Sequence, residues 1–436
     1  MTQSSKSLSR AIVGQPRRFA ALTASALICG LAFATACSDD DDGPTGTAGT
    51  GGRGGSAGTG GTAGSAGRGG SGGSAGSAGS AGSAGSAGAG GTSNAGGPTG
   101  TVTVLSSDAQ LRGPTTAAIR GTNLWVVNGQ LNTLGGTPAT VQPFNVVSVP
   151  LAGGAIGNTI TLPGTNFFPE GIAAAVDGTL YVGSVTLGTI VRVPATSTTP
   201  DTAPFVADTV SQRGVIGLTV DEGAGRGLLW FCDSNPTLAV GAGAGGALVG
   251  VDLDDGTEVV RHELPNPGSS AADAGADAAA DAGDAGTAGG VATFCNDVIV
   301  AQNGNIYVTD SRGRIFRIPA ADARTPNSAD VWLADPEIAP PQPDGFGANG
   351  IDIVGGQLII ASGDHLVAVD PTSNNPASTV RHINLTEGGT ATTLCGPDGL
   401  QAVPNSTTDL IVVENGSCST TADRDRVVRI TLDLTP

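Results

Sequence analysis

Short apolar runs, separated by polar and glycine-rich turns, dominate the chain from about residue 101 to its end. Residues 296–319 show the pattern most clearly. An apolar run ends at an Asn-Gly turn at 303–304, and a second run of β-forming residues ends at an Arg-Gly turn at 312–313. A third run alternates Arg-Ile-Phe-Arg-Ile before Pro319. Runs of this length joined by tight turns predict three strands in a meander.

The same meander recurs along the chain. Six copies cover residues 115–149, 171–194, 215–253, 296–319, 350–371 and 399–432. Their first strands start roughly 50 residues apart except across one insertion, which is within the range of propeller blades. Because one meander cannot bury its own faces, radial packing of four-stranded blades around a channel is the arrangement that covers them. The sequence therefore predicts an all-β fold, a six-bladed β-propeller over residues 101–436.

The first 36 residues have the layout of a secretion signal. They contain four basic residues and no acidic one, and an apolar run at 19–36 ends in small residues directly before Cys37. This order resembles a bacterial lipoprotein signal, which implies that Cys37 is lipidated and that the protein is exported and membrane-anchored, in the periplasm or at the cell surface. Ordinary secretion, an uncleaved anchor and the twin-arginine route through Arg17-Arg18 are the open alternatives.

Two low-complexity segments interrupt the apolar pattern. Residues 37–100 consist almost entirely of Gly, Ser, Ala and Thr after a short acidic run, and residues 269–290 are rich in Ala, Asp and Gly. Neither segment has side chains able to form a core, so we expect both to be disordered. The first predicts a flexible tether between Cys37 and the propeller. The second predicts an insertion between blades three and four, without the framework of a calcium-binding loop.

The charge of the chain excludes several partners. The formal net charge is −18, and removal of the four positive charges in residues 1–36 brings it to near −22. Nucleic acids need a basic face, so this charge argues against them. It argues equally against docking on an anionic membrane surface. Contact with a membrane is therefore expected only through the lipid anchor.

Four of the six cysteines fall within the predicted propeller, which indicates disulfides in an exported domain. Blade topology places all four at the end of the channel where the first strands begin, the channel mouth. Cys232 and Cys295 then lie on neighbouring blades, and Cys395 and Cys418 lie within blade six. We expect these two pairs, with free buried thiols as the alternative. Only three histidines and no Cys-x-x-Cys occur, which argues against a zinc site of the Cys/His type.

A ring of polar residues is expected at the channel mouth. The residue just before each first strand lies on the same face in every blade, and these residues are Pro114, Glu170, Gly214, Asn296, Asn349 and Asp398. Four of the six carry oxygen donors, which suit calcium, magnesium or manganese. The alternative is that these polar side chains only bond strand ends and trapped water.

The motifs around these positions resemble the senescence-marker-protein/gluconolactonase family, the regucalcin-like lactonases. They are Pro169-Glu170-Gly171, Asn296-Asp297, Ala348-Asn349-Gly350-Ile351 and Gly396-Pro397-Asp398-Gly399. The resemblance, which covers about residues 168–414, implies one divalent cation held by Glu170, Asn349 and Asp398. Calcium is expected first, with magnesium, manganese or zinc as alternatives. It also implies that Asp398 is the general base of lactone hydrolysis and that Asn296 binds the substrate.

Two departures from the family pattern bear on the substrate. Phe294 stands where the family has an arginine that grips a sugar acid, so Phe294 is expected to face the substrate. The family begins at the blade that carries the Glu and has a further blade after the one that carries the Asp. Here a blade, residues 115–149, precedes the Glu170 blade, and the chain stops after the Asp398 blade. We therefore expect a lactonase that acts on a less polar lactone or ester. The alternative is a non-catalytic propeller that binds a protein or a small molecule.

Overall fold

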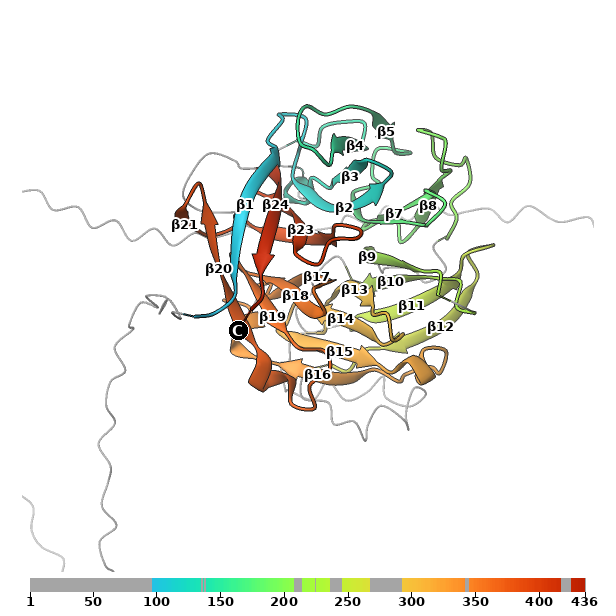
Figure 1. Cartoon of the computed structure of the whole chain (residues 1–436). Coiled ribbons are helices and arrows are strands. Elements are labelled where there is room, and N and C mark those ends of the chain that lie inside the picture. Colours follow the sequence, from blue (N-terminus) through green and yellow to red (C-terminus); the bar gives the residue numbers. More distant parts are fainter. Residues whose placement is uncertain are drawn as a thin grey trace, which may run out of the picture.

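The computed structural model describes residues 96–435, apart from positions 135, 137–138, 208–213, 224, 236–244, 267–291, 342–344 and 417–424. The strands in these residues form six blades around a common axis (Figure 1). The inner strands of successive blades contact one another, and those of blades six and one close the ring. The predicted six-bladed β-propeller is confirmed. None of the described helices has the length and apolar character needed to cross a membrane.

Blades one to three are formed by consecutive strands. Blade one comprises β2 (Pro114–Arg120), β3 (Asn123–Asn128), β4 (Asn145–Pro150) and β5 (Thr159–Thr161). Blade two comprises β6 (Pro169–Ala174), β7 (Leu180–Ser184) and β8 (Ile190–Val193), and a single bridge from Ile190 to Val206 takes the place of a fourth strand. Blade three comprises β9 (Gly214–Asp221), β10 (Leu228–Ser234), β11 (Ala247–Asp252) and β12 (Glu258–Glu263).

Blades four to six follow the same order from the axis outward. Blade four comprises β13 (Cys295–Val300), β14 (Ile306–Asp310), β15 (Arg314–Ile318) and β16 (Asp330–Ala334). Blade five comprises β17 (Ala348–Val354), β18 (Gln357–Ser362), β19 (His365–Val369) and β20 (Arg381–Glu387), with β21 (Thr390–Thr392) paired to β20. Blade six comprises β22 (Pro397–Ala402), β23 (Asp409–Asn415) and β24 (Asp425–Asp433).

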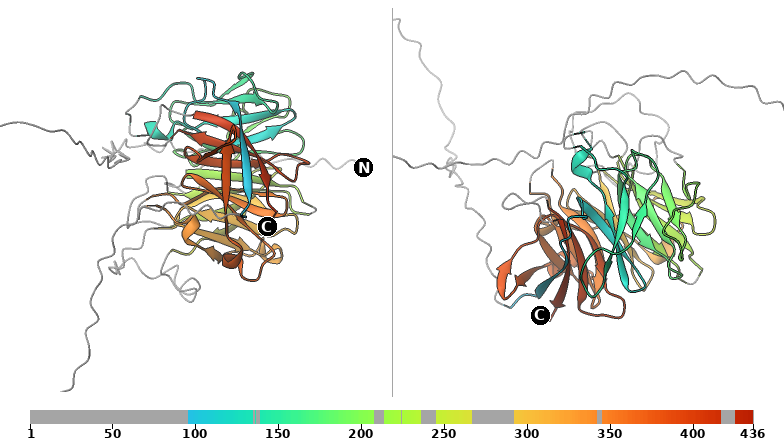
Figure 2. Two further views of the ribbon diagram at one scale, coloured as in Figure 1. Left: turned by 60° about the vertical axis from the view of Figure 1, so that its left-hand side comes forward. Right: turned by 90° about the horizontal axis from the view of Figure 1, so that it is seen from above.

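The fourth strand of blade six comes from the other end of the chain. β1 (Thr99–Ser106) pairs antiparallel with β24 and parallel with β20, so it joins blades five and six (Figure 2). The pattern of apolar runs did not predict this strand. β1 starts at residue 99, two residues before the predicted domain boundary at residue 101. The boundary was predicted too late because the Thr-Gly pair at 99–100 resembles the low-complexity segment in composition.

The apolar cores lie mainly between adjacent blades. Ile411 and Val413 of blade six, for example, pack with Leu124 and Val126 of blade one. Successive strand residues point to opposite faces of a blade, and both faces are covered by neighbouring blades. This is why β3 reads as a nearly continuous apolar run and is buried almost throughout. Each such aliphatic side chain contributes about 1.5–3 kcal/mol when it is fully buried.

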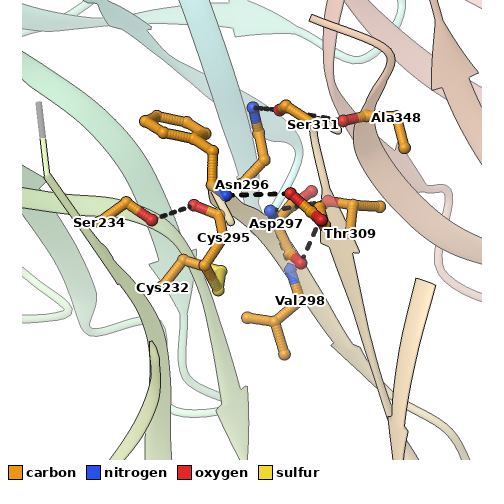
Figure 3. Close-up of a disulfide and its surroundings, with 11 residues drawn as sticks. Cys232, Ser234, Cys295, Asn296, Asp297, Val298, Thr309, Ser311 and Ala348 are labelled. Atoms are coloured by element: carbon orange, nitrogen blue, oxygen red, sulfur yellow. Dashed lines mark hydrogen bonds between the residues drawn. A yellow bond between two sulfur atoms is a disulfide. The ribbon is translucent and has the colours of Figure 1, made fainter. Parts of the chain in front are cut away.

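One predicted disulfide links two blades. Cys232, near the end of β10, is bonded to Cys295, the first residue of β13, with the two Cα atoms 5.2 Å apart (Figure 3). This pairing confirms the prediction for blades three and four. Cys395 is also disulfide-bonded, but Cys418 lies outside the described residues, so that pairing stays a prediction. The signal segment, Cys37, residues 37–95 of the tether and the insertion at 269–290 also lie outside them.

We expect a variant that begins at residue 96 to unfold at the same temperature as the full-length protein. A variant that begins at residue 107 lacks β1 and should be strongly destabilised, because burial of Val102 and Leu105 alone contributes about 3–6 kcal/mol. Thermal unfolding followed by circular dichroism measures both effects. Melting of the shorter variant within a few degrees of the longer one would show that β1 does not secure the ring.

Candidate functional site

Each inner strand carries a β-bulge at an equivalent position near the channel mouth. Two residues of the inner strand lie opposite one residue of the second strand, and such bulges re-aim side chains. The six pairs are Thr115–Thr116, Glu170–Gly171, Ile216–Gly217, Asn296–Asp297, Asn349–Gly350 and Asp398–Gly399. The four predicted oxygen donors are therefore the first members of equivalent pairs on four blades.

Two members of the predicted ring were wrong. Pro114 and Gly214 pair regularly with the second strands of blades one and three, before the bulge. Thr115 and Ile216 occupy the ring positions instead. The ring positions of these two blades were predicted one and two residues too early, because a bulge depends on pairing with another strand and leaves little trace in the local sequence.

The second member of most pairs is glycine because the inner strands approach one another closely. A Cβ atom on Gly171 would lie 2.0 Å from the main-chain oxygen of Ile216, on the next blade. One on Gly350 would lie 2.1 Å from the main-chain oxygen of Asp398. No side chain fits at such distances, so glycine permits the contact. The preceding residues are thereby held around a narrow axis.

Glu170 is fixed in the ring by its backbone. Its main-chain oxygen accepts hydrogen bonds from Oγ1 of Thr115, at 2.8 Å, and of Thr116, at 2.5 Å. Phe168, two residues earlier, has φ of 39°, a conformation that favours glycine and costs about 1–3 kcal/mol in a bulky residue. The Glu170 side chain is buried. Desolvation, followed by the nearby charges of Asp398 and Asp297, raises the pKa of Glu170 well above its usual value.

Asp398 and Asn349 lie beside each other on neighbouring blades. Burial raises the pKa of Asp398 to about 7, although hydrogen bonds from Asn415 and Asn349 favour the charged form and lower it in part. Nδ2 of Asn415 lies 3.2 Å from Oδ2 of Asp398. Asp398 therefore interacts with both of the other predicted ligands. It accepts a hydrogen bond from Asn349, and its charge raises the pKa of Glu170.

The donor set fits a divalent cation. Oε2 of Glu170 and Oδ1 of Asn349 are both buried, and neither has a hydrogen-bond partner within the described part of the chain. Such orphaned oxygens are rare, because a buried polar atom without a partner is costly. Two carboxylates and an amide oxygen are hard donors of the type that binds calcium or magnesium. A bound cation would satisfy these oxygens and offset the repulsion between Glu170 and Asp398.

Asn296 occupies the equivalent bulge of blade four, next to Asn349 on the ring. Its Nδ2 donates to Oγ of Ser311 at 2.9 Å, and that hydroxyl donates to the main-chain oxygen of Ala348 at 3.1 Å (Figure 3). This chain of hydrogen bonds ties blade four to the start of β17 and fixes the amide of Asn296. A role for Asn296 in substrate binding stays a prediction.

Phe294 lies two residues before Asn296 and is mostly covered. Only 9% of its surface is exposed, and its ring packs edge-on against Phe346 with centroids 5.4 Å apart. The guanidinium of Arg312 lies 5.9 Å from the centroid of the Phe346 ring. The two rings form an apolar wall, so the structure places Phe294 mainly in packing. Direct contact between Phe294 and a substrate stays a prediction.

Asp297 belongs to the Asn296-Asp297 motif, but its own part in the site was not predicted from the sequence. It occupies the bulge position that is glycine in four of the blades, and its carboxylate accepts hydrogen bonds from the main-chain N–H groups of Val298 and Ile351. Burial, together with the charges of Asp352 and Asp398, raises its pKa to about 8. Asp297 and Asp352 also line a channel cavity of about 60 Å³. The sequence signal that could have identified Asp297 is an acidic residue at a position that is glycine in four of the six repeats.

Acids at the ends of second strands hold the segments that lead into the ring. Asp310 accepts the main-chain N–H of Phe294 at 2.9 Å and pairs with Arg314 at 2.6 Å. Glu414 accepts the main-chain N–H of Cys395 at 2.5 Å and pairs with the guanidinium of Arg426. These contacts brace the residues just before Asn296 and Asp398.

Comparisons with known proteins identify the fold. No family model matches the sequence, and no curated protein matches it. The structure is similar to a luciferin-regenerating enzyme, with a TM-score of 0.50 and 14% identity over 77% of this chain and 95% of that one. It is also similar to a streptogramin B lyase, with a TM-score of 0.47 and 12% identity over 77% of this chain and 98% of that one.

A putative gluconolactonase matches with a TM-score of 0.47 and 11% identity, over 77% of this chain and 93% of that one. At such low identities, structural likeness establishes the propeller fold alone.

We expect the protein to bind one calcium ion, and Glu170→Gln and Asp398→Asn each to weaken binding about 100-fold or more. Removing one charged partner from a buried ion pair costs about 3 kcal/mol, and a loss of this size in binding free energy corresponds to about a 100-fold loss of affinity. Titration calorimetry measures the affinity. The exposed Asp330 of β16 supplies the control, since Asp330→Asn should bind as the wild type does. Unchanged affinity in both site variants would contradict the assignment.

Stability without metal should fall as the pH rises. The pKa of Asp398 is about 7 in the folded protein and about 4 when unfolded, so the folded state holds more protons between these values. This contribution is fully present below about pH 4 and lost as the pH rises through about 7. Calcium, which needs the ionised carboxylate, should raise the melting temperature more at pH 8 than at pH 5.5. An equal increase at both values, measured against chelator, would contradict the linkage.

Proposed function

We propose that this protein is a metal-dependent hydrolase of a lactone or ester, displayed outside the cytoplasm and tethered by lipid at Cys37. The observation that carries the activity is the convergence of Glu170, Asn349 and Asp398, with two buried oxygens that have no partner in the described chain. The location rests on the sequence alone, and mass spectrometry of the mature N-terminus, expected at a lipid-modified Cys37, tests it.

In this proposal Glu170, Asn349 and Asp398 hold the cation, which when bound supplies positive charge to polarise the carbonyl group and stabilise developing negative charge. Asp398, which is ionised when it holds the cation, acts as general base. As the water oxygen bonds to the carbonyl carbon, Asp398 takes a proton from that water. When the ester C–O bond breaks, the proton passes from Asp398 to the leaving alkoxide oxygen.

The surroundings support these roles. Asn415 donates to Asp398 and orients its carboxylate, while Ser311 holds the amide of Asn296, which would position the substrate. Phe294 and Phe346 present apolar rings in place of a charged clamp, and the nearby guanidinium of Arg312 bonds the main-chain oxygens of Ala292 and Gly345. These contacts favour a substrate with an apolar portion next to the scissile carbonyl group.

A non-catalytic binding propeller is the second candidate. One observation favours it: Glu170, Asn296 and Asp398 are each no more than 6% exposed, which leaves little of their surface open to a ligand. In that case the cation would stabilise the ring, and a partner would bind elsewhere on the mouth face. Both candidates predict calcium binding, so only turnover separates them.

We expect the calcium-loaded protein to hydrolyse aliphatic lactones faster than gluconolactone, because the Phe294 wall replaces a charged clamp with apolar surface. Product release is measured by pH-indicator assay over a panel of lactones matched in ring size. Asp398→Asn should abolish turnover, and the surface variant Asp330→Asn should not change it. Equal or better turnover of gluconolactone would refute the preference, and absence of turnover on the whole panel would favour the non-catalytic candidate.

A further inference from the structure

A second group of ligand-type side chains lies on the outer part of blade five. His365 begins β19 and His382 lies in β20, which are the third and fourth strands outward from the axis (Figure 1). Glu337 comes from the short 3-10 helix Pro336–Ile338, in the connection between β16 and β17. One donor atom from each residue lies within 4.8 Å of the others.

The spacing of these atoms matches metal coordination. Oε2 of Glu337 lies 3.3 Å from Nδ1 of His382 and 3.6 Å from Nε2 of His365. Bonds of about 2.0–2.1 Å in tetrahedral geometry place neighbouring ligand atoms about 3.3 Å apart. The two imidazole rings stack with centroids 4.6 Å apart, and one nitrogen of each lies beside the same carboxylate oxygen.

The surroundings of His365 call for a cation. Its Nδ1 faces Oδ1 of Asp364 at 3.3 Å, and its Nε2 faces the main-chain oxygen of Glu337 at 3.0 Å. Both ring nitrogens therefore face oxygen acceptors, while a neutral imidazole carries only one N–H. With that proton on Nδ1, the lone pair of Nε2 points to the Glu337 oxygens. A metal ion there would take this lone pair, and Asp364 would orient the ligand in the way typical of histidines bound to zinc.

We propose that Glu337, His365 and His382 bind a transition-metal ion of the zinc class. Two imidazoles and one carboxylate suit zinc, copper or nickel, whereas the channel mouth offers only oxygen donors. His382 and Glu337 are 43% and 46% exposed, which leaves a coordination position for water. The ion would tie the connection from blade four to the outer strands of blade five. The site is independent of the proposed hydrolase activity.

This site uses no cysteine, so it differs from the Cys/His type that the sequence argued against. The three ligands are separated by 28 and 17 positions, and no compact motif connects them. Only the fold brings them together. The third histidine, His262, is buried and hydrogen-bonded to Ala323 and Ser328, apart from this group.

The test is titration of the calcium-loaded full-length protein with zinc chloride, because saturating calcium occupies the channel mouth. We expect one zinc ion per protein. The double variant His365→Ala/His382→Ala should lose this binding and keep its calcium affinity, which also shows that it is folded. Asp398→Asn should lose calcium and keep zinc. Asp364→Asn should weaken zinc binding about 10–100-fold through the orientation of His365.

Each other outcome counts against the site. Wild-type zinc affinity in the double histidine variant would place the ion elsewhere and overturn the proposal. Absence of zinc binding to the wild-type protein would overturn it too. In that case His365 is expected to be protonated on both nitrogens, as a simple ion-pair partner of Asp364 and Glu337, which nitrogen chemical shifts in NMR would reveal.

Discussion

The close approach of the inner strands around the axis is the constraint on which the rest of the molecule depends. At Gly171 and Gly350 the neighbouring backbone lies so near that no side chain fits. Each inner strand meets this constraint with a two-residue bulge, in which the first residue points its side chain into the ring and the second contacts the next blade. The first residue is therefore buried in five of the blades, and Asn349 in blade five is partly buried. The chemistry of the ring follows from six single residues.

This geometry buries several carboxyl groups, and neighbouring hydrogen bonds offset part of the free-energy cost of their desolvation. Glu170, Asp398 and Asp297 are carboxyl groups buried within reach of one another, and burial raises the pKa of each. Hydrogen bonds from backbone N–H groups and from Asn415 favour the charged forms and offset part of this cost. A cation at Glu170 and Asp398 would offset more. The burial of these carboxyl groups, on which the proposed cation site rests, is thus a consequence of how tightly the blades pack.

The blades must be held in register for the ring to remain intact. β1 connects the start of the propeller to its last blade, and the Cys232–Cys295 disulfide joins blades three and four just before Asn296. The Asp310–Arg314 and Glu414–Arg426 pairs fix the segments that lead into two inner strands. Each of these contacts lies at a point where one blade meets another or where an inner strand begins.

The sequence by itself determined the meander and the blade number, because turn dipeptides and strand periodicity are local properties. From the blade order it also determined the four oxygen donors of the ring and one disulfide. The tertiary structure decided what depends on distant partners. Pairing with the second strand placed Thr115 and Ile216 in the ring. Pairing with β24, more than 300 residues away, makes β1 the fourth strand of blade six. Glu337, His365 and His382 meet only across two blades, since no local pattern records which loop will face which strand.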